Sequence, residues 1–263
     1  MNFLETILDR KRKEVERLKM EVPLDDLRRQ PSYLCEPRSL RAALLGAPMA
    51  IIAEIKKASP SKQVIRNDFQ PVALARSCAE GGARALSVLT DREFFQGDLD
   101  YLREIRRAVD IPLLRKDFII DEYQVHEAKA AGADAILLIL AALDASTFSV
   151  LSMLAAELGL EALVEVHSVE DLEKASGASL PLVGINNRDL VTFQTDLSAT
   201  FRVRSALLPG TMIVSESGIR TSGELRELMK IGIHAALIGE TLMTAADPGA
   251  KIRELLDPLG GTR

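Results

Sequence analysis

The sequence has no tryptophan, few other aromatic residues and only two cysteines, and these absences already exclude several kinds of protein. Cys35 and Cys78 do not have the spacing of metal ligands. A chain of 263 residues also builds a core without disulfide bonds. We therefore expect both cysteines to be reduced and to have a structural role.

A long apolar run is also missing. The longest, Ala135 to Leu143, is far shorter than the roughly 20 residues of a membrane-spanning helix. Residues 1–20 are charged and amphipathic, unlike a secretory signal. The net charge of −5 opposes nonspecific attraction to nucleic acids and anionic membranes. We expect a cytoplasmic protein that binds neither of them and that holds anions by local groups.

Familiar catalytic motifs are absent as well. His126, His167 and His234 lie far apart and form no H-E-x-x-H pattern, so no metal site is expected. We interpret His167 as a partly exposed loop residue. The sequence contains no G-x-S-x-G and no Walker motif, so neither serine hydrolysis nor nucleotide hydrolysis is supported.

The chain does contain a regular alternation of two kinds of segment. Hydrophobic residues make up 47% of it, enough for a large core. From residue 49 onward, short aliphatic and β-branched runs alternate with helix-like segments, which predicts βαβ units and a parallel sheet. The runs predict strands at Ala50–Ile55, Ala85–Leu89, Pro112–Lys116, Ala135–Ile139, Ala162–Val166, Leu182–Asn186, Met212–Glu216 and Ala236–Gly239.

Eight such units favour closure into a (β/α)8 TIM barrel, because closure leaves no unpaired sheet edge. An open, doubly wound sheet is the alternative. It is disfavoured because the glycine-rich turn G-x-G-x-x-G does not follow the first strand. We predict one barrel domain over residues 1–263, with the barrel itself at 49–263.

Residues 1–48 are predicted to form an N-terminal helical extension. Asn2 and Glu5 resemble a capping box, and apolar residues recur near helical spacing. The charged residues between them are expected to form a solvated face: Lys11, Arg12, Lys13, Glu14, Glu16 and Arg17. The extension could instead cap one end of the barrel.

Charged residues recur where the predicted strands end. Side chains two residues apart share one face of a strand, so Glu54 and Lys56 are both expected inside the barrel mouth. The same alternation is expected to bring further polar side chains to this end, where barrel enzymes keep their chemistry: Lys116, Glu165, Asn186, Arg188 and Glu216. Lysines and carboxylates gathered in a cleft are candidates for proton transfer.

A phosphate site is predicted beside them. Ser217 and Gly218 follow the seventh strand and Gly239 ends the eighth, positions that supply N–H donors to phosphate in many barrels. A tight turn is the alternative reading of Ser-Gly. Ser59 and Ser61 could add hydroxyl donors after the first strand.

Aromatic side chains are rare, so those near the predicted mouth stand out. Phe94, Phe95 and Phe118 are candidate flat walls for a planar substrate ring, although they could also pack under a loop.

In these residues and the segments around them, the sequence resembles the indole-3-glycerol-phosphate synthase family. The resemblance extends over almost the whole predicted barrel and also includes the N-terminal extension. Its most specific parts are the segments 54–61, Glu-x-Lys-x-x-Ser-Pro-Ser, and 186–190, Asn-Asn-Arg-Asp-Leu. Others are 86–91, 114–118, 164–167 and 215–219.

The resemblance implies a lyase of tryptophan biosynthesis. Its substrate would be 1-(2-carboxyphenylamino)-1-deoxyribulose 5-phosphate, which loses CO2 and water to give indole-3-glycerol phosphate. No metal or organic cofactor is implied, and the protein is expected to be a monomer or a weak homodimer.

The resemblance also implies roles for single residues. Lys116 would be the general acid, Glu165 the base and Lys56 the group that holds the substrate carboxylate, with Glu54 fixing Lys56. Asn186 joins this catalytic set. Substrate-binding positions would be Arg188, Glu216, Ser217, Gly218, Gly239, Ser59, Ser61, Phe95, Phe118 and Leu190. Glu240 departs from the family, where a small hydroxyl residue is common, and we expect its carboxylate to turn away from the phosphate.

Two other functions stay open. Another phosphate-binding barrel, such as an aldose–ketose isomerase acting on a phosphoribosyl amine, is disfavoured by lysines at two strand ends, because such isomerisations use carboxylate or thiol pairs. A barrel without activity that only binds a ligand is the second alternative.

Overall fold

The computed structural model describes residues 3–175, 177–189 and 193–260. Its centre is a closed barrel of eight parallel strands in the order β1-β10-β9-β8-β7-β6-β5-β4, with β4 paired back to β1. These strands are β1 Ala50–Ile55, β4 Ala85–Leu89, β5 Leu113–Lys116, β6 Ala135–Ile139, β7 Glu161–Val166, β8 Leu182–Asn186, β9 Met212–Glu216 and β10 Ala235–Ile238. The predicted (β/α)8 barrel is confirmed, and each strand lies within one residue of its predicted bounds.

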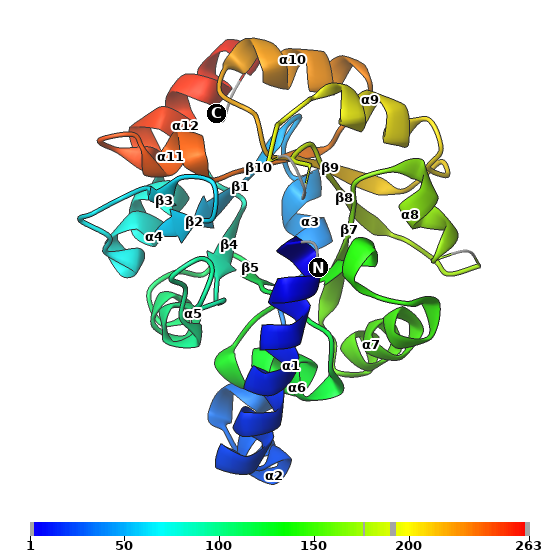
Figure 1. Cartoon of the computed structure of the whole chain (residues 1–263). Helices are drawn as coiled ribbons and strands as arrows, with labels where there is room; N and C mark the ends of the chain where they lie inside the picture. The colour runs from blue at the N-terminus through cyan, green and yellow to red at the C-terminus, as the bar shows by residue number, and fades with distance from the viewer. Residues whose placement is uncertain (1–2, 176, 190–192, 261–263) are drawn as a thin grey trace.

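Helices surround the barrel; those from α4 to α10 connect successive strands, and α11 and α12 follow the last strand (Figure 1). They are α4 Pro71–Glu80, α5 Leu99–Arg106, α6 Glu122–Ala131, α7 Ala145–Glu157, α8 Val169–Glu173, α9 Ser198–Arg204, α10 Ser222–Lys230, α11 Glu240–Met243 and α12 Pro248–Leu256. Short 3-10 turns lie at η2 Leu140–Ala142 and η3 Asp257–Leu259. A small antiparallel hairpin, β2 Ala58–Ser59 with β3 Gln63–Val64, forms in the loop after β1 and was not predicted.

Polar side chains fix where many of these helices begin. The residue just before the helix accepts a hydrogen bond from a backbone N–H group of the first turn, which otherwise has no partner. Such caps precede α5, α6, α7, α8, α10 and α12 and are Asp98, Asp121, Asp144, Ser168, Thr221 and Asp247. The start of each helix, and so the loop that enters it, is therefore set locally.

The core has two layers because strand side chains alternate between faces. Ile51, Ala53 and Ile55 of β1 point outward into the layer between barrel and helices. Ala50 and Ile52 point inward, where they pack with Leu163 and other residues that fill the barrel. Glu54 continues the inward set, so its carboxyl group reaches the end of the barrel interior, as the alternation predicted.

The N-terminal extension covers both ends of the barrel. It contains α1 Phe3–Glu21, α2 Leu24–Arg28, η1 Pro31–Leu34 and α3 Leu40–Leu45. Leu40 and Leu44 of α3 and Ile7 of α1 pack with the inward-facing strand residues. In Figure 1, α1 lies across the front of the barrel and α3 is seen behind it. Asn2, the predicted helix cap, lies outside the described residues.

One expectation for the extension is wrong. Lys11 does not belong to a solvated face, because its side chain is only 2% exposed and forms ion pairs with acidic residues of the barrel. Arg12, Lys13, Glu16 and Arg17 are exposed as expected. Lys11 is buried because it lies four residues from both Ile7 and Val15, on the stripe that faces the protein.

Candidate active site

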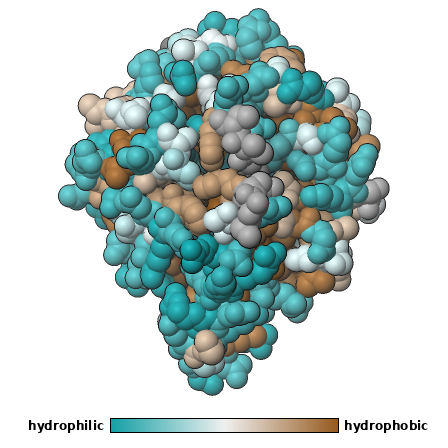
Figure 2. Space-filling model, viewed as in Figure 1, coloured by the Kyte–Doolittle hydropathy of each residue, from teal (hydrophilic) through white to brown (hydrophobic). Residues whose placement is uncertain are grey.

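A cavity of about 970 Å³, open to solvent, lies at the carboxyl ends of the strands, under α1. Figure 2 shows an apolar area near the middle of this face, surrounded mostly by hydrophilic residues. The cavity brings together predicted site residues from β1, β5, β7, β8 and β9, from their loops and from the loop after β4. These are Glu54, Lys56, Ser59, Ser61, Phe95, Lys116, Phe118, Glu165, Asn186, Arg188, Glu216 and Ser217.

Lys116 occupies the centre of the charged part of the cavity. It ends β5, and its Nζ donates to Oε2 of Glu165, at 2.8 Å, and to Oε2 of Glu216. The two carboxylates end β7 and β9, so residues 100 positions apart converge on one amine. Lys116 is 13% exposed at its side chain, Glu165 3% and Glu216 1%. A cation is thus held in a nearly dry site and faces the cavity.

Lys116, Glu165 and Glu216 differ in how readily they ionise. Burial raises the pKa of Glu216 to about 8, against the attraction of Lys116 and with the help of repulsion by Glu165. Burial alone would also raise the pKa of Glu165, but the charge of Lys116 and the hydrogen bonds from Lys116 and Asn186 outweigh it and lower that pKa to about 2. Both carboxylates hold the pKa of Lys116 well above its usual value. The Lys116 ammonium therefore lies between one carboxyl group whose surroundings favour its charged form and one whose burial favours its protonated form.

The second lysine, Lys56, donates to the Glu54 carboxylate on the same face of the chain. Lys56 remains 15% exposed at its side chain, so its ammonium can reach the cavity. Gly239 lies against this pair, and a Cβ atom there would overlap with the Glu54 carboxylate. A larger residue after β10 would therefore displace the pair from this position.

Two adjacent asparagines organise the end of β8. The Nδ2 of Asn186 donates to Oε1 of Glu165 at 3.1 Å, and its Oδ1 accepts from the backbone N–H of Arg188 at 3.0 Å. Asn187 is buried, and its Nδ2 donates to the backbone oxygens of Glu216, at 2.9 Å, and Ser217, at 3.1 Å. Asn187 was not predicted as a site residue, although it stands in the motif. It fixes the turn that follows β9.

The predicted phosphate site forms a second, smaller cavity next to the first, with about 430 Å³ of space. Ser217, Gly218 and Gly239 line it. Ser217 and Gly218 both have positive φ, 69° and 83°, which turns the chain sharply after β9. Lys56 and Arg188 border both cavities, so the smaller one is an anion-sized recess with cations at its edge.

Arg188 connects the loops around this recess. Its Nη1 donates to Oγ of Ser61 at 3.3 Å, and its Nη2 lies 3.4 Å from Oε2 of Glu240. Lys62, in the loop between β2 and β3, lies 3.6 Å from the other oxygen of Glu240. The expectation that Glu240 turns away from the phosphate site is therefore wrong. It lines both cavities because two cations attract its carboxylate.

The apolar part of the cavity is only partly as expected. Phe95 and Phe118 line it, with ring centroids 6.2 Å apart. Phe94 instead packs edge-on against Phe3, with centroids 5.7 Å apart. The extension supplies lining residues that sequence reasoning missed, Phe3, Leu4 and Ile7. Their apolar spacing predicted a helix but not which surface the helix covers.

His167 is a partly exposed loop residue near the mouth, as predicted, and it lies beside Glu165. Its Nε2 is 3.5 Å from Oε1 of Glu165, and its side chain is 16% exposed. Leu190, the remaining predicted binding residue, lies outside the described residues. Within residues 3–175, 177–189 and 193–260, no group of three or more His, Cys, Asp or Glu side chains could hold a metal ion. The expected lack of a cofactor stays a prediction.

Comparison with known families identifies the chain. The family model described as indole-3-glycerol phosphate synthase matches residues 4–255. The chain belongs to this family. Its relatives named indole-3-glycerol phosphate synthase include proteins of Roseiflexus castenholzii and of Roseiflexus sp. strain RS-1. Each is 49% identical over 263 residues, which covers 96% of this chain and 97% of the relative.

Membership confirms the expected activity. The chain is a carboxy-lyase of tryptophan biosynthesis that forms indole-3-glycerol phosphate from 1-(2-carboxyphenylamino)-1-deoxyribulose 5-phosphate. No helix in the described part of the chain is long and apolar enough to cross a bilayer.

Solved structures resemble the fold more distantly. A 3-hexulose-6-phosphate synthase aligns with a TM-score of 0.62 at 18% identity and covers 79% of this chain and 98% of its own. A mutant tryptophan synthase α-subunit from Pyrococcus furiosus aligns with a TM-score of 0.60 at 16% identity, covering 81% of this chain and 98% of its own. At these identities the likeness concerns the barrel fold alone.

Proposed function

We propose that the cavity closes the indole ring with Lys116 as general acid, Glu165 as base and Lys56 as the cation that holds the substrate carboxylate. The observation that carries this proposal is the contact of Lys116 Nζ with Glu165 and Glu216 in a nearly dry site. A charged ammonium there can give a proton to an oxygen that enters the cavity. The Glu165 carboxylate keeps the proton on the amine until a stronger acceptor forms.

Ring closure is the first step. The aromatic carbon that bears the carboxylate attacks the ketone carbon, a C–C bond forms and negative charge develops on the ketone oxygen. Lys116 transfers a proton to that oxygen, so the charge does not build up. Lys56 holds the carboxylate near the attacking carbon, and Phe95 and Phe118 are proposed to confine the aromatic ring.

Loss of CO2 then returns the bonding electrons to the ring and restores its aromaticity. Dehydration follows: the new hydroxyl leaves as water after protonation by a lysine, and Glu165 removes a proton from the new five-membered ring. The position of Glu165 beside Lys116 couples the two steps. Once Lys116 has given up its proton, the cation that lowers the pKa of Glu165 is gone, so Glu165 becomes a stronger base.

The phosphate end of the substrate is proposed to bind in the smaller cavity. Backbone N–H groups around Ser217, Gly218 and Gly239 would donate to it, and Arg188 and Lys56 supply positive charge at its edge. Ser61 accepts a hydrogen bond from Arg188, and Ser59 lies 3.4 Å from Ser61 at their Oγ atoms. Both line the larger cavity beside Arg188, from where they would add hydroxyl donors. A binding role for Leu190 is proposed only because it belongs to the segment Asn-Asn-Arg-Asp-Leu.

We further propose that the chain works as one domain, in the cytoplasm, as a monomer or weak homodimer without nucleic acid. Size-exclusion chromatography with light scattering, at concentrations from about 1 to 100 times that of an ordinary assay, would measure the assembly state. A stable higher oligomer would contradict this part.

A steady-state assay tests the activity directly. Purified protein is given the carboxyphenylamino substrate, and indole absorbance is recorded. A parallel assay with a phosphoribosyl amine substrate measures isomerase activity. Turnover of the first substrate alone is expected. Turnover of the second alone would favour the isomerase alternative, and phosphate binding without any turnover would favour a barrel that only binds ligands.

Glu216→Gln is expected to change the pH profile. The raised pKa of Glu216, about 8, means that the wild-type carboxyl group loses its proton as the pH rises through that value. The new charge would tighten the hold of Lys116 on its proton and repel the anionic substrate. Wild-type kcat/KM should therefore fall above pH ~8, while the variant keeps its neutral-pH value there. Profiles from pH 6 to 10 measure this, with the exposed Glu254→Gln as control. An identical alkaline fall in Glu216→Gln would contradict the assignment.

Glu240→Gln is expected to strengthen anion binding. The substitution removes a carboxylate from the wall of the phosphate recess and frees Arg188, so the inhibition constant of inorganic phosphate should fall roughly 3- to 10-fold. The shift should shrink at high salt because the site is partly open to solvent. Glu227→Gln, an exposed pair partner of Lys230, is the matched control. An unchanged constant would show that Glu240 does not compete with phosphate.

A further inference from the structure

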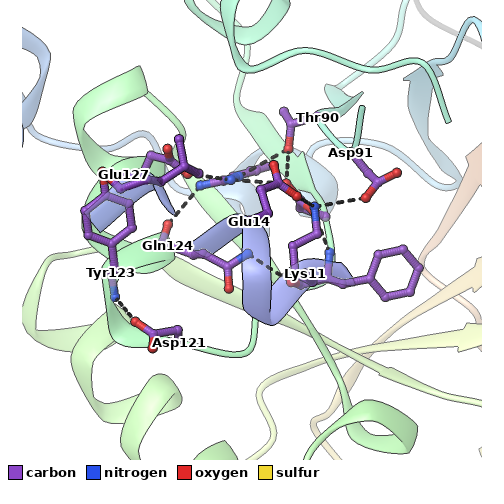
Figure 3. Close-up of polar contacts among 12 residues, drawn as sticks. Lys11, Glu14, Thr90, Asp91, Asp121, Tyr123, Gln124 and Glu127 are labelled. Carbon is purple, nitrogen blue, oxygen red and sulfur yellow. Dashed lines mark hydrogen bonds and ion pairs between the residues drawn. The ribbon is translucent and has the colours of Figure 1, made fainter. Parts of the chain in front are cut away.

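Lys11 lies in an unusual place for a lysine. It belongs to α1, which covers the barrel mouth, and it is buried on the apolar stripe between Ile7 and Val15. Its Nζ lies 2.9 Å from Oδ2 of Asp91 and 2.9 Å from Oδ1 of Asp117, and 2.7 Å from Oε2 of Glu14. Figure 3 shows Lys11 pointing from the helix toward Asp91, with Glu14 beside it.

The two aspartates belong to the walls of the active-site cavity. Asp91 follows β4, and its Oδ1 accepts from the backbone N–H of Phe94 at 2.8 Å. Asp117 follows Lys116 directly, and its Oδ1 accepts from the N–H of Phe118 at 2.8 Å. The contacts of Lys11 therefore hold together the loop that carries Phe95 and the strand end that carries the proposed general acid.

The charges of the two aspartates are balanced in different ways. Asp117 has a second cation, because Nη2 of the buried Arg115 lies 3.1 Å from its Oδ2. For Asp91, Lys11 is the ion-pair partner in the described part of the chain. Without the ammonium of Lys11, a buried carboxylate would face a cavity that must accept an anionic substrate. The repulsion energy between two like charges is far larger in such a buried site than at the surface.

We propose that Lys11 is a positioning residue of this enzyme: it neutralises Asp91 and Asp117 so that the cavity wall beside Lys116 admits the anionic substrate. Docking of α1 and the charge of the cavity are thereby linked, because the same amine that fixes the helix removes the negative charge from the wall. The inference rests on the proposed binding of the carboxyphenylamino substrate in this cavity.

The test compares full-length variants under steady-state conditions. Lys11→Met is expected to raise KM roughly 10-fold or more, because it makes the electrostatic potential of the cavity more negative toward the anionic substrate. It should change kcat less than about threefold, because it leaves the reacting groups in place. Lys11→Met with Asp91→Asn removes both charges and is expected to recover most of the KM. Lys13→Met, an exposed residue of the same helix paired with Asp9, is the control and should stay within twofold.

The double variant separates charge balance from simple anchoring of the helix. If Lys11 only fastened α1, a second substitution at Asp91 would not lower KM, so equal KM values for single and double variants would overturn the proposal. If the single variant does not fold, the double variant decides by comparison with wild type, since it has no unpaired Asp91 charge. If neither folds, Lys11→Arg, which keeps the charge, decides: KM within about threefold of wild type supports the inference, and a tenfold rise overturns it. Wild-type turnover tests the proposed function separately, and its absence would not be a result about Lys11.

Discussion

Lys116→Met is expected to lower kcat by about 10²- to 10⁴-fold, the usual contribution of a positioned proton donor. Methionine has a similar length and no proton to give, so the ketone oxygen would develop charge without compensation during ring closure. KM should change much less, because Lys56 and the phosphate recess are proposed to provide most of the substrate binding. Single-turnover measurements of indole formation would give the rate of the chemical step.

The same substitution also removes the cation between Glu165 and Glu216, so stability must be measured alongside activity. Leaving a buried charge without its partner costs on the order of 3–5 kcal/mol, and thermal unfolding will show whether the assay temperature lies below the transition. Lys230→Met, at an exposed position of α10, is the control. A folded Lys116→Met enzyme with near-normal kcat would remove Lys116 from the mechanism.

Glu165→Gln is expected to lower kcat by roughly 10²- to 10³-fold while the protein folds normally. Glutamine keeps the shape and can still hydrogen-bond to Lys116, but it cannot accept the proton that leaves the new ring. Because the first steps do not need this base, an intermediate that has already lost CO2 should accumulate. Chemical quench with measurement of released CO2 against indole formed would detect it.

Glu173→Gln, on the exposed side of α8, controls for the loss of a nearby carboxylate. Equal rates of CO2 release and indole formation in Glu165→Gln would place this residue before decarboxylation and contradict its role in dehydration. The two variants thus distinguish the acid from the base. Lys116→Met should prevent both CO2 release and indole formation, whereas Glu165→Gln should mainly prevent indole formation.

Much of the fold follows from local pattern. Eight apolar runs alternate with amphipathic segments, and the strands lie where those runs are because short β-branched segments between helices are buried on both faces of a parallel sheet. Strand parity also placed Glu54 and Lys56 on one face, since a two-residue period leaves no alternative. The catalytic roles of these residues are still predictions that the variants above will test.

The positions of other side chains depended on contacts between segments that are far apart in the sequence. The spacing of Ile7, Lys11 and Val15 put the lysine on the apolar stripe, but charge alone suggested solvent, because its partners in the barrel, Asp91 and Asp117, are 80 or more positions away in the chain. Glu240 was expected to avoid the phosphate site, yet Arg188 and Lys62 attract it there from other loops. Asn187 was passed over because its partners at the end of β9 are not neighbours in sequence.

The sequence by itself determined the order of strands and helices, the face on which each strand side chain lies, and the chemical types gathered at the barrel mouth. Only the tertiary structure decided which charges pair there, that the N-terminal helix covers the mouth, and how far each carboxyl group departs from its ordinary pKa. The physical reason is that periodicity acts over a few residues, whereas ion pairing and burial depend on distances across the closed barrel.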